Sequence, residues 1–470
     1  MPINPHPATN LPRRRFLKWT AAGIAACAAA TPPSTAAPSI RTSRTRTARD
    51  PGSARNIIFM VSDGMSQGTL SLADMFRRQH EQRSSEWLAL FARDGIRRAL
   101  YSTRAADSLV VDSAAAGSCW GCGHRVNNGA LNITPDGVQR LPLLVHAAQS
   151  GKATGVVTTT RVTHATPASF VVNCARRDWE GPIAAQLLDR RVDLVLGGGR
   201  RFFKSDLLAA HPDLTVVRDR AALLDIAPKG GRLLGLFAES HLPFVLDQPA
   251  TVPSLAEMTR IALRRLDTAP NGFVIQIEGG RVDHAAHSND APSLIREQLA
   301  FDDAIAEVMR FIDGGRADDT LVILTTDHGN ANPGLTVYGP EAQAGFDRLA
   351  KVTRSGEWFF DELNKLPEAD RAGGAPGLLT IATGIEFDEV EKRYLADAVA
   401  AKRVAPFREQ SKFESVVGGI LANHFGIGFV SGNHTADYVE VTALGPGSET
   451  LAPTGHNADL HPLMVAALGL

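Results

Sequence analysis

The 470-residue sequence has few cysteines, no excess of either charge and no apolar run near its N-terminus long enough to span a bilayer. Its four cysteines include one Cys-x-x-Cys pair, Cys119 and Cys122, and no second pair that would complete a zinc site. The formal net charge of -1 gives no indication of a nucleic-acid or membrane-surface partner. The Ala-rich stretch from Trp19 to Ala30 is shorter than the roughly 20 apolar residues of a transmembrane helix. With 44% hydrophobic and 21% charged residues, the composition is typical of a soluble globular protein.

The beginning of the chain carries an export pattern. Arg13-Arg14-Arg15-Phe16-Leu17-Lys18 matches the twin-arginine motif, and the Ala-rich stretch follows it directly. We therefore predict a twin-arginine signal peptide over residues 1–37, a flexible linker over 38–54 and a periplasmic or extracellular location. Two processing routes stay open, since cleavage could follow Ala37, while Ile24-Ala25-Ala26-Cys27 resembles a lipobox that would make Cys27 a lipid anchor.

Without Cys27, the exported chain would keep Cys119, Cys122 and Cys174. An odd count leaves at least one thiol unpaired. We interpret Cys119 and Cys122 as small buried helix residues, and a bridge between Cys122 and Cys174 stays open as the alternative.

Apolar runs that end in polar residues alternate with helical patterns along the chain. The predicted strands are Asn56–Val61, Ala153–Thr160, Val192–Leu196, Gly272–Ile277 and Leu321–Thr326. Helical periodicity covers Leu70–Phe76, Trp87–Phe91, Leu255–Leu266 and Pro292–Phe311. This alternation predicts an α/β fold, a three-layer α/β/α sandwich around a central, mostly parallel sheet. Gly197–Gly199 is interpreted as a turn rather than a phosphate loop.

The part of the chain after the fifth predicted strand has a different residue pattern. Residues from about 331 to 425 contain charged helical patterns such as Phe387–Lys402, so we predict an inserted helical segment there. Phe425–Ser431 resembles a last strand, and Val439–Val441 and a helical stretch over Leu463–Leu468 close the chain.

Polar side chains gather where the predicted strands end. They are Asp63, Thr166, Glu278, Asp283, His287, Asp327, His328 and His434. In open α/β sheets ligands bind at the carboxyl ends of the strands, so these residues are expected to converge. Zinc takes imidazoles and carboxylates where no thiolate is available, and carboxylates with hydroxyls suit magnesium. A single such residue is more often a helix cap or a core histidine, but their joint occurrence favours a metal site.

The step from Asp112 to Ser113 begins a predicted helix, because Val110-Val111 precede it and alanines follow. A helix start attracts anions through its unpaired N–H groups and its dipole. Taken alone, this stretch predicts an ordinary helix cap. Beside a metal site, it predicts a nucleophilic hydroxyl aimed at an anionic substrate.

From about Asn56 to the C-terminus the chain resembles the alkaline phosphatase family. The motifs that carry the resemblance are Val61-Ser62-Asp63-Gly64, Asp112-Ser113-Ala114-Ala115, His164-Ala165-Thr166-Pro167, Glu278–His287, Thr325-Thr326-Asp327-His328-Gly329 and Asn433-His434-Thr435. Each is weak alone, but their order and spacing fit the family. The resemblance makes residues 55–470 one catalytic domain that contains the insertion.

The resemblance implies three metal sites, with two Zn²⁺ and one Mg²⁺. One zinc would be held by Asp283, His287 and His434. A second zinc would be held by Asp63, Asp327 and His328, with Ser113 as a further ligand. Asp63 would also bridge to the third site, usually magnesium, which Thr166 and Glu278 complete. His164 and His284 stand where family members carry either His or Asp, and His or Lys, so the identity of the third metal stays open.

The implied reaction is hydrolysis of phosphate monoesters at alkaline pH through a phosphoserine on Ser113, releasing phosphate and an alcohol. Zinc would lower the pKa of the Ser113 hydroxyl, and Arg177 would clamp two phosphate oxygens while Asp112 orients it. His164 and His284 would tune phosphate binding and release. A homodimer stays open, as do two alternatives: a phosphodiesterase of the same superfamily and a non-catalytic exported binder of metal or phosphate. A sulfatase is disfavoured because the Ser113 stretch lacks the C/S-x-P-x-R pattern.

Overall fold

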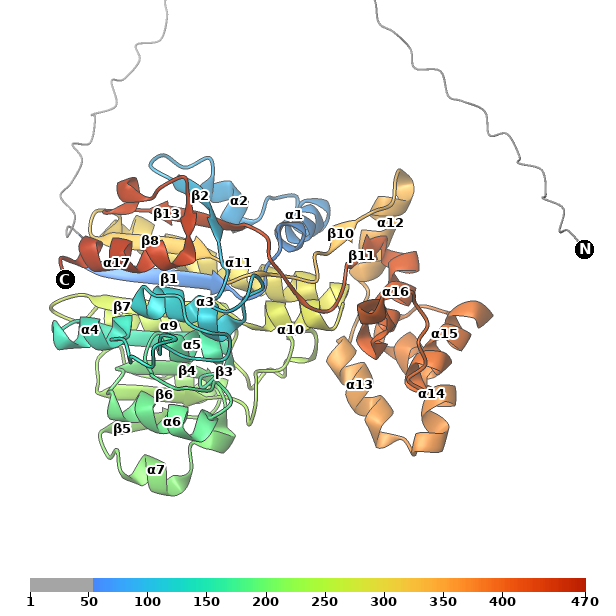
Figure 1. The fold of residues 1–470 in the computed structure, drawn as a ribbon, viewed down its shortest axis with the longest axis horizontal. Coiled ribbons are helices and arrows are strands. Elements are labelled where there is room, and N and C mark those ends of the chain that lie inside the picture. Colours follow the sequence, from blue (N-terminus) through green and yellow to red (C-terminus); the bar gives the residue numbers. More distant parts are fainter. Residues whose placement is uncertain (1–53) are drawn as a thin grey trace, which may run out of the picture. The chain divides into compact units, whose positions relative to one another are not determined.

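The computed structural model describes residues 54–470, and the predicted signal peptide and linker up to residue 53 lie outside the described residues. Within this range one large sheet has the strand order β14-β2-β13-β8-β1-β7-β3-β4-β6-β5 (Figure 1). Its strands are β1 Asn56–Ser62, β2 Arg97–Ser102, β3 Ala153–Arg161, β4 Leu194–Gly198, β5 Leu214–Val217, β6 Arg232–Leu236, β7 Phe273–Gly279, β8 Thr320–Thr325, β13 Val439–Leu444 and β14 Thr454–His456.

The centre of the sheet is parallel. β1 pairs in parallel with β7 on one side and β8 on the other, and β7 pairs in parallel with β3. The antiparallel strand is β13, which lies between β8 and β2. Every residue of β1, β7 and β8 is buried, as expected of strands covered on both faces.

Alternate residues of β1 enter two different hydrophobic cores, because successive side chains of a strand point to opposite faces. Ile57 and Phe59 pack in the core under α3, α4, α5, α6 and α17. Ile58 and Met60 pack in the core under α2, α9, α10 and α11. Helices therefore cover both faces of the sheet, which confirms the predicted three-layer α/β/α sandwich.

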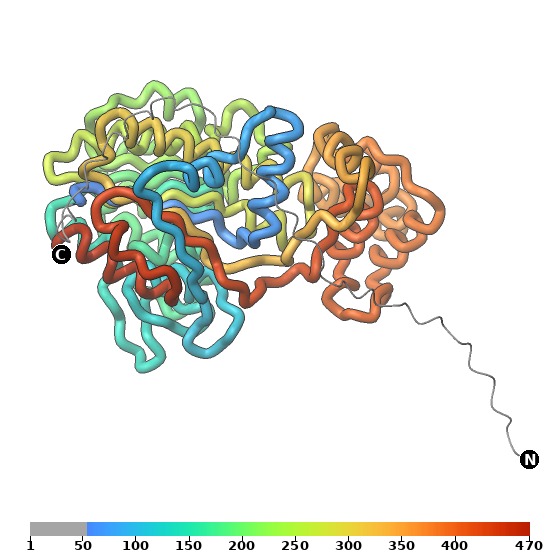
Figure 2. Tube along the Cα trace, turned by 90° about the horizontal axis from the view of Figure 1, so that it is seen from above, coloured from blue at the N-terminus to red at the C-terminus, as the bar shows by residue number. Residues whose placement is uncertain are grey.

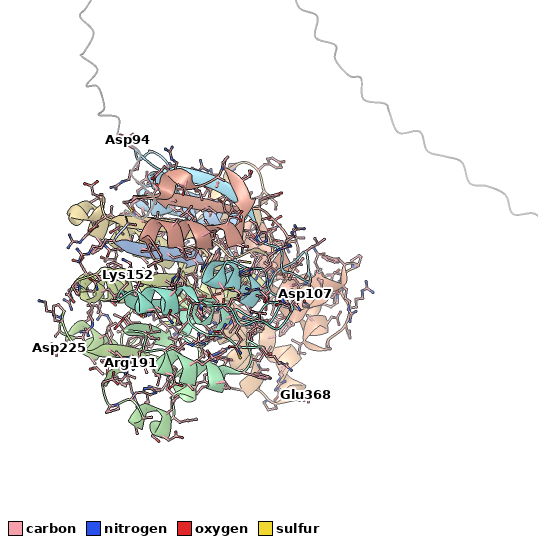
Figure 3. The ribbon with its side chains drawn as sticks, turned by 60° about the vertical axis from the view of Figure 1, so that its left-hand side comes forward. Asp94, Asp107, Lys152, Arg191, Asp225 and Glu368 are labelled. Carbon is pink, nitrogen blue, oxygen red and sulfur yellow. The ribbon has the colours of Figure 1, made fainter. Side chains whose placement is uncertain are left out.

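The helices on the two faces have the following bounds: α1 Gln67–Glu81, α2 Glu86–Leu90, α3 Ser113–Cys122, α4 Leu143–Gln149, α5 Ala165–Ser169, α6 Glu180–Asp189, α7 Ser205–Ala209, α8 Arg220–Leu224, α9 Leu255–Leu266, α10 Arg281–His287, α11 Ala291–Phe311 and α17 Leu460–Leu468. Charged side chains such as Asp107, Arg191 and Glu368 lie at the outside of the folded unit (Figure 3).

The helical segment predicted between about 331 and 425 consists of α12 Pro340–Leu349, α13 Gly356–Lys365, α14 Glu368–Thr383, α15 Glu389–Val399 and α16 Phe413–Phe425. These helices share a third core with one side of α1 and α11, to which Phe76 and Ile295 contribute. They lie beyond the carboxyl end of β1, on the side of α10 (Figures 1 and 2). Two short ladders border the segment: β10 Gly334–Leu335 with β11 Ile427–Gly428, and β9 Gly329–Asn330 with β12 His434–Thr435.

Two local predictions are wrong. The strand expected over Phe425–Ser431 is absent from the main sheet, because α16 continues to Phe425 and ends at Gly426, whose φ of 71° is left-handed. The glycines interpreted as a turn are partly strand, since Gly197 and Gly198 end β4. A Cβ at Gly198 would lie 2.0 Å from the Ser240 carbonyl oxygen, so glycine permits this close approach.

No helix among residues 54–470 combines the length and the apolar character needed to cross a membrane. The three cysteines of this range, Cys119, Cys122 and Cys174, are all buried and free. The structure therefore contains no bridge between Cys122 and Cys174.

Candidate active site

Four neighbouring strands deliver the polar residues of the site. β8, β1, β7 and β3 are adjacent and parallel, so their carboxyl ends meet at one edge of the sheet. Asp327 follows β8, Asp63 follows β1, Glu278 ends β7 and Thr166 follows β3 in α5. All four side chains are buried, with no exposed surface. The structure thus brings together residues that lie more than 260 positions apart in the chain.

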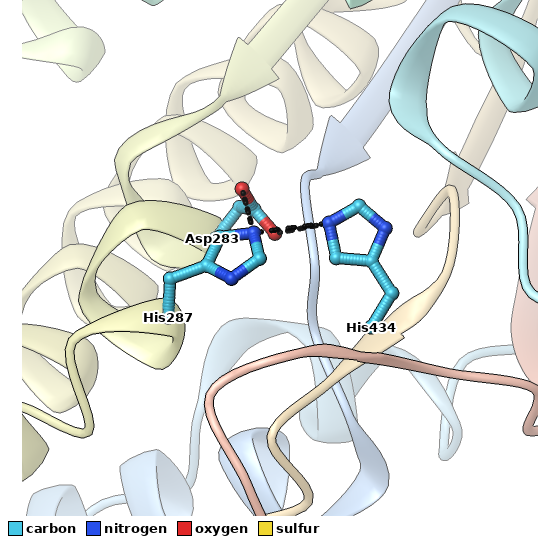
Figure 4. Close-up of side chains that lie close together, drawn as sticks. All are labelled: Asp283, His287 and His434. Atoms are coloured by element: carbon cyan, nitrogen blue, oxygen red, sulfur yellow. Dashed lines mark hydrogen bonds and ion pairs between the residues drawn. The ribbon is translucent and has the colours of Figure 1, made fainter. Parts of the chain in front are cut away.

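A first cluster contains Asp283 and His287 of α10 and His434 of β12 (Figure 4). His287 Nε2 lies 3.3 Å and His434 Nε2 3.5 Å from the Asp283 carboxylate, and the two Nε2 atoms lie 3.0 Å apart. Each imidazole donates from Nδ1 to a backbone carbonyl, His287 to Gly432 at 2.8 Å and His434 to Val111 at 2.8 Å. Both Nε2 lone pairs therefore face the carboxylate, an arrangement that needs a proton or a cation among them.

The two imidazoles of the first cluster differ in pKa. Burial opposes protonation of His287, but the Asp283 carboxylate outweighs it and raises the pKa of His287 to about 9. Burial, together with His328, lowers the pKa of His434 to about 4. Without a metal ion, the pKa values thus favour the proton on His287 rather than on His434.

A second cluster surrounds His328, whose ring stacks on His434 with centroids 3.6 Å apart. His328 Nε2 lies 3.0 Å from Asp327 Oδ2 and 3.8 Å from Asp63 Oδ1. The other Asp327 oxygen accepts from the backbone N–H groups of Gly64 and His328. Burial raises the pKa of Asp63 well above its usual value, and the nearby carboxylates of Asp327, Asp283 and Glu278 raise it further. So many buried carboxylates call for a compensating cation.

A third group is formed by Asp63, Glu278 and His164, whose ligand atoms lie within 4.8 Å of one another. Thr166 joins them by donating from Oγ1 to Asp63 Oδ2 at 3.0 Å. Asp63 Oδ1, Glu278 Oε1 and His164 Nδ1 are buried and lack a hydrogen-bond partner. Burial raises the pKa of Glu278 to about 7. Because buried carboxylate oxygens are rarely left unpaired, Asp63 and Glu278 fit a metal ion. Nδ1 of His164 carries the ring hydrogen, since its Nε2 accepts from Arg177.

The predicted nucleophile begins α3 beside the second cluster. Asp112 is the N-cap, and its Oδ1 accepts from Ala115 N–H at 2.9 Å. Ser113 is 1% exposed, and its Oγ lies 3.4 Å from His328 Nε2. α3 approaches α5 closely because Gly121 faces the Ser169 carbonyl, where a Cβ would lie 2.1 Å from the oxygen.

The predicted arginine lies on the other side of Asp112. Arg177 donates from Nη1 to Asp112 Oδ2 at 3.0 Å, and its Nη2 lies 3.0 Å from His164 Nε2. Its neighbour Arg176 is exposed and lies 3.8 Å from Asp178, away from these groups. The structure therefore brings Arg177, and not Arg176, to Asp112, the residue before the predicted nucleophile.

Two residues near this arginine were missed from the sequence. His241, in the loop after β6, has its ring 5.4 Å from that of His164 and 4.3 Å from that of His284. Arg281 donates from Nη1 to His284 Nδ1 at 2.8 Å. No local pattern marks His241, because it does not follow a predicted strand. Arg281 stands inside a quoted motif, three residues before His284, a spacing that places both on one helix face.

An α/β sandwich that gathers buried carboxylates and imidazoles able to hold a metal ion beside a buried hydroxyl is typical of metal-dependent hydrolases. A family model described as alkaline phosphatase matches residues 54–470. Alkaline phosphatase 3 of Bacillus subtilis is 27% identical over 88% of this chain and 89% of its own length. The repressible alkaline phosphatase of Saccharomyces cerevisiae is 32% identical over 65% of this chain, which spans only 61% of the yeast protein.

Solved structures agree with these relatives. The crystal structure of Thermus thermophilus alkaline phosphatase has a TM-score of 0.81 and 34% identity, covering 89% of this chain and 92% of that one. The cold-active alkaline phosphatase of a psychrophilic Shewanella has a TM-score of 0.74 and 26% identity, covering 88% and 99%. The chain belongs to the alkaline phosphatase family. The family resemblance, the fold class and the expectation of a phosphatase are confirmed.

Proposed function

We propose that this protein hydrolyses phosphate monoesters at alkaline pH, with Ser113 as the nucleophile, releasing inorganic phosphate and an alcohol. The observation that carries the proposal is the position of the Ser113 hydroxyl. It lies 3.4 Å from His328 of the second cluster and directly follows Asp112, which holds Arg177. A hydroxyl between cation ligands and a guanidinium is suited to attack on a phosphate group.

We infer that the three groups hold two zinc ions and one magnesium ion. Asp283, His287 and His434 would hold the first zinc, and Asp63, Asp327, His328 and Ser113 the second. Asp63, Thr166 and Glu278 would hold the magnesium. When bound, such cations neutralise the charge of a phosphate ester and lower the pKa of a coordinated hydroxyl.

The residues of the chain then act in two steps. Ser113 Oγ gives up its proton to solvent and attacks phosphorus, the ester P–O bond breaks, a phosphoserine forms, and the alkoxide takes up a proton from solvent to leave as the alcohol. Water next attacks the same phosphorus, and the P–O bond to Ser113 breaks, which restores the hydroxyl and releases phosphate. Arg177 holds two phosphate oxygens in both steps, and Asp112 keeps its guanidinium in place. The free N–H groups at the start of α3 favour the same anion.

A phosphodiesterase and a non-catalytic binder are the competing proposals. The paired Arg177 argues against the diesterase, because a monoester presents more free anionic oxygens to a bidentate donor than a diester does. The binder would not need a buried hydroxyl beside the ligands, yet Ser113 occupies that place.

Turnover of p-nitrophenyl phosphate should be compared with turnover of its bis ester and of p-nitrophenyl sulfate. We expect the monoester to be the best substrate, with activity lost on chelation and restored by zinc. Ser113→Ala should lower kcat by about 10³-fold or more. Zinc content is measured alongside, because Ser113 is also proposed as a ligand of the second zinc. Ser118→Ala removes a second hydroxyl from α3 and serves as the control. Faster turnover of the bis ester would favour the diesterase, and metal binding without turnover of any ester would favour the binder.

We further propose that the protein is exported by the twin-arginine route and reaches the periplasm or the exterior, with Cys27 as an alternative anchor. The motif Arg13–Lys18 supports this part of the proposal. A homodimer is also proposed, and the molar mass of the exported protein from light scattering tests it.

A further inference from the structure

Arg281 lies at the start of α10 and connects three elements. Its side chain is 4% exposed. Nη1 donates to His284 Nδ1 at 2.8 Å, and Nη2 forms an ion pair with Glu357 of α13. The guanidinium lies over the ring of Phe244, 3.7 Å from its centroid. A buried charge is thus held between the metal-binding helix and the helical segment.

The contact with Arg281 decides which nitrogen of His284 carries the proton. A guanidinium has donors and no acceptor, so Nδ1 must accept, and the hydrogen of the neutral ring lies on Nε2. A ring turned by 180° would place a carbon against Nη1 and lose the bond. Within the described chain no residue hydrogen-bonds to Nε2, and the side chain is only partly buried. Nε2–H is therefore available to a ligand.

His284 also lies close to the residues proposed to bind phosphate. Its ring is 5.6 Å from the ring of His164, whose Nε2 lies 3.0 Å from Arg177 Nη2. His241 also packs edge-on against it, with centroids 4.3 Å apart, and its ring lies 5.4 Å from that of His164. Two contacts therefore hold the imidazole, one at Nδ1 and one at the ring edge.

We propose that Arg281 is a positioning residue of the phosphate site: it orients His284 so that Nε2–H donates to an oxygen of bound phosphate, and Glu357 holds Arg281 in place. This inference rests on the proposed function, since it takes phosphate as the ligand. It gives the helical segment a role in substrate binding through one ion pair. Arg281 itself does not touch the substrate.

A double-mutant cycle on the dissociation constant of inorganic phosphate tests the proposal. Calorimetric titration of the zinc- and magnesium-loaded protein would compare the parent, Arg281→Met, His284→Asn and the double variant. We expect each single change to raise the dissociation constant about tenfold, and the double variant to bind no more weakly than His284→Asn alone. The proposal would be overturned if the effects of the two single changes multiplied, so that the dissociation constant of the double variant rose about 100-fold. Unchanged binding by Arg281→Met would also overturn it.

Removing a buried arginine can unfold a protein, so Glu357, whose side chain is 51% exposed, provides a milder variant. We expect Glu357→Gln to raise the dissociation constant about twofold to fivefold, and to have no effect in the His284→Asn background. Glu362→Gln, on the same helix and paired with Lys365, is the matched control and should leave binding unchanged. Equal binding by Glu357→Gln and the parent would overturn the role of α13.

Metal content decides whether Arg281 acts through His284 or through the clusters. Zinc and magnesium per protein should be equal in all variants, and a loss of metal in Glu357→Gln would overturn the positioning role. Failure of the proposed function would give a different result from failure of the positioning role. The parent would not turn over p-nitrophenyl phosphate, while the phosphate titrations would still report the coupling of Arg281 to His284.

Discussion

Single residues of the site are oriented mainly by their second hydrogen bonds. His287 and His434 donate from Nδ1 to Gly432 and Val111, which turns both Nε2 atoms toward Asp283. His284 has the opposite tautomer: its Nδ1 accepts from Arg281, which leaves the hydrogen on Nε2. Imidazoles with a fixed tautomer bind a given ligand at less entropic cost than free ones do.

Arg177 provides the first test at this scale. Arg177→Lys should lower kcat/KM for phosphate monoesters by about 10- to 100-fold, because an ammonium cannot pair with two phosphate oxygens and with Asp112 in one plane. Steady-state kinetics on p-nitrophenyl phosphate measure the change. Arg176→Lys, at the exposed neighbour, should be neutral; an equal loss in both variants would contradict the assignment of the clamp.

The raised pKa of His287 predicts how the stability of the metal-stripped protein depends on pH. Its pKa of about 9 lies above the ordinary 6.5, so the protonated ring stabilises the fold fully below pH 6.5, and this contribution is lost as pH rises to 9. Glu278, with a pKa raised to about 7, adds the same trend up to pH 7. The melting temperature after chelation should therefore fall between pH 6.5 and 9.

Two controls accompany this measurement. The His287→Asn variant should show a smaller fall, because it has no proton to lose at this position. The zinc-loaded protein should also show a smaller fall, because a metal ion replaces the proton between His287 and Asp283. A melting temperature that rises from pH 6.5 to 9 in the stripped protein would contradict the prediction.

At the scale of elements, the proposed nucleophile Ser113 begins α3 and Thr166 lies in α5, and these two helices pack closely where Gly121 of α3 faces Ser169. Gly121→Ala should destabilise the protein by about 1–3 kcal/mol, because the new methyl group would meet the Ser169 carbonyl at 2.1 Å. Separation of the helices should also shift Ser113 and lower kcat about tenfold or more. Urea unfolding and steady-state kinetics measure the two effects.

Gly181→Ala is the matched control for that prediction. Gly181 lies in α6, and a Cβ there would meet no atom within 4 Å. The change should be neutral or stabilise the protein by up to about 1 kcal/mol. Equal destabilisation by both variants would mean that close packing of α3 on α5 is not the cause.

The spacing along α10 shows how an element converts sequence into geometry. Asp283 and His287 are four residues apart and Arg281 and His284 three apart, so both pairs lie on helix faces that a 3.6-residue turn fixes. One helix therefore carries both the pair proposed to bind zinc and the histidine proposed to face phosphate.

At the scale of the whole molecule, export is the testable prediction. Replacing Arg13 and Arg14 by Lys should retain the phosphatase activity in the cytoplasm, because the transport pathway reads the arginine pair. Activity in cell fractions measures this, with Arg41→Lys and Arg44→Lys as controls. Export that persists without Arg13 and Arg14 would contradict the twin-arginine route. Release of membrane-bound activity by Cys27→Ala would show that Cys27 is the anchor.

Local patterns in the sequence were enough to predict the strands β1, β3, β4, β7 and β8 and the polar residues that follow them, but not the strands β2, β5, β6 and β14. Buried strands read as continuous apolar runs, and parallel strands end at one edge, so polar strand ends such as Asp63 and Asp327 had to meet. The family motifs added the positions of Ser113 and Arg177. The twin-arginine pattern was identified from the sequence alone, without reference to the fold.

Only the tertiary structure decided which distant segments meet. His241 comes to His284 from a loop, and Glu357 reaches Arg281 from a segment 76 residues further along the chain. Phe425–Ser431 has a strand-like composition, yet α16 continues into it and β11 pairs outside the main sheet. Such contacts depend on how the layers pack, because side chains without a periodic pattern leave no local signal of their partners.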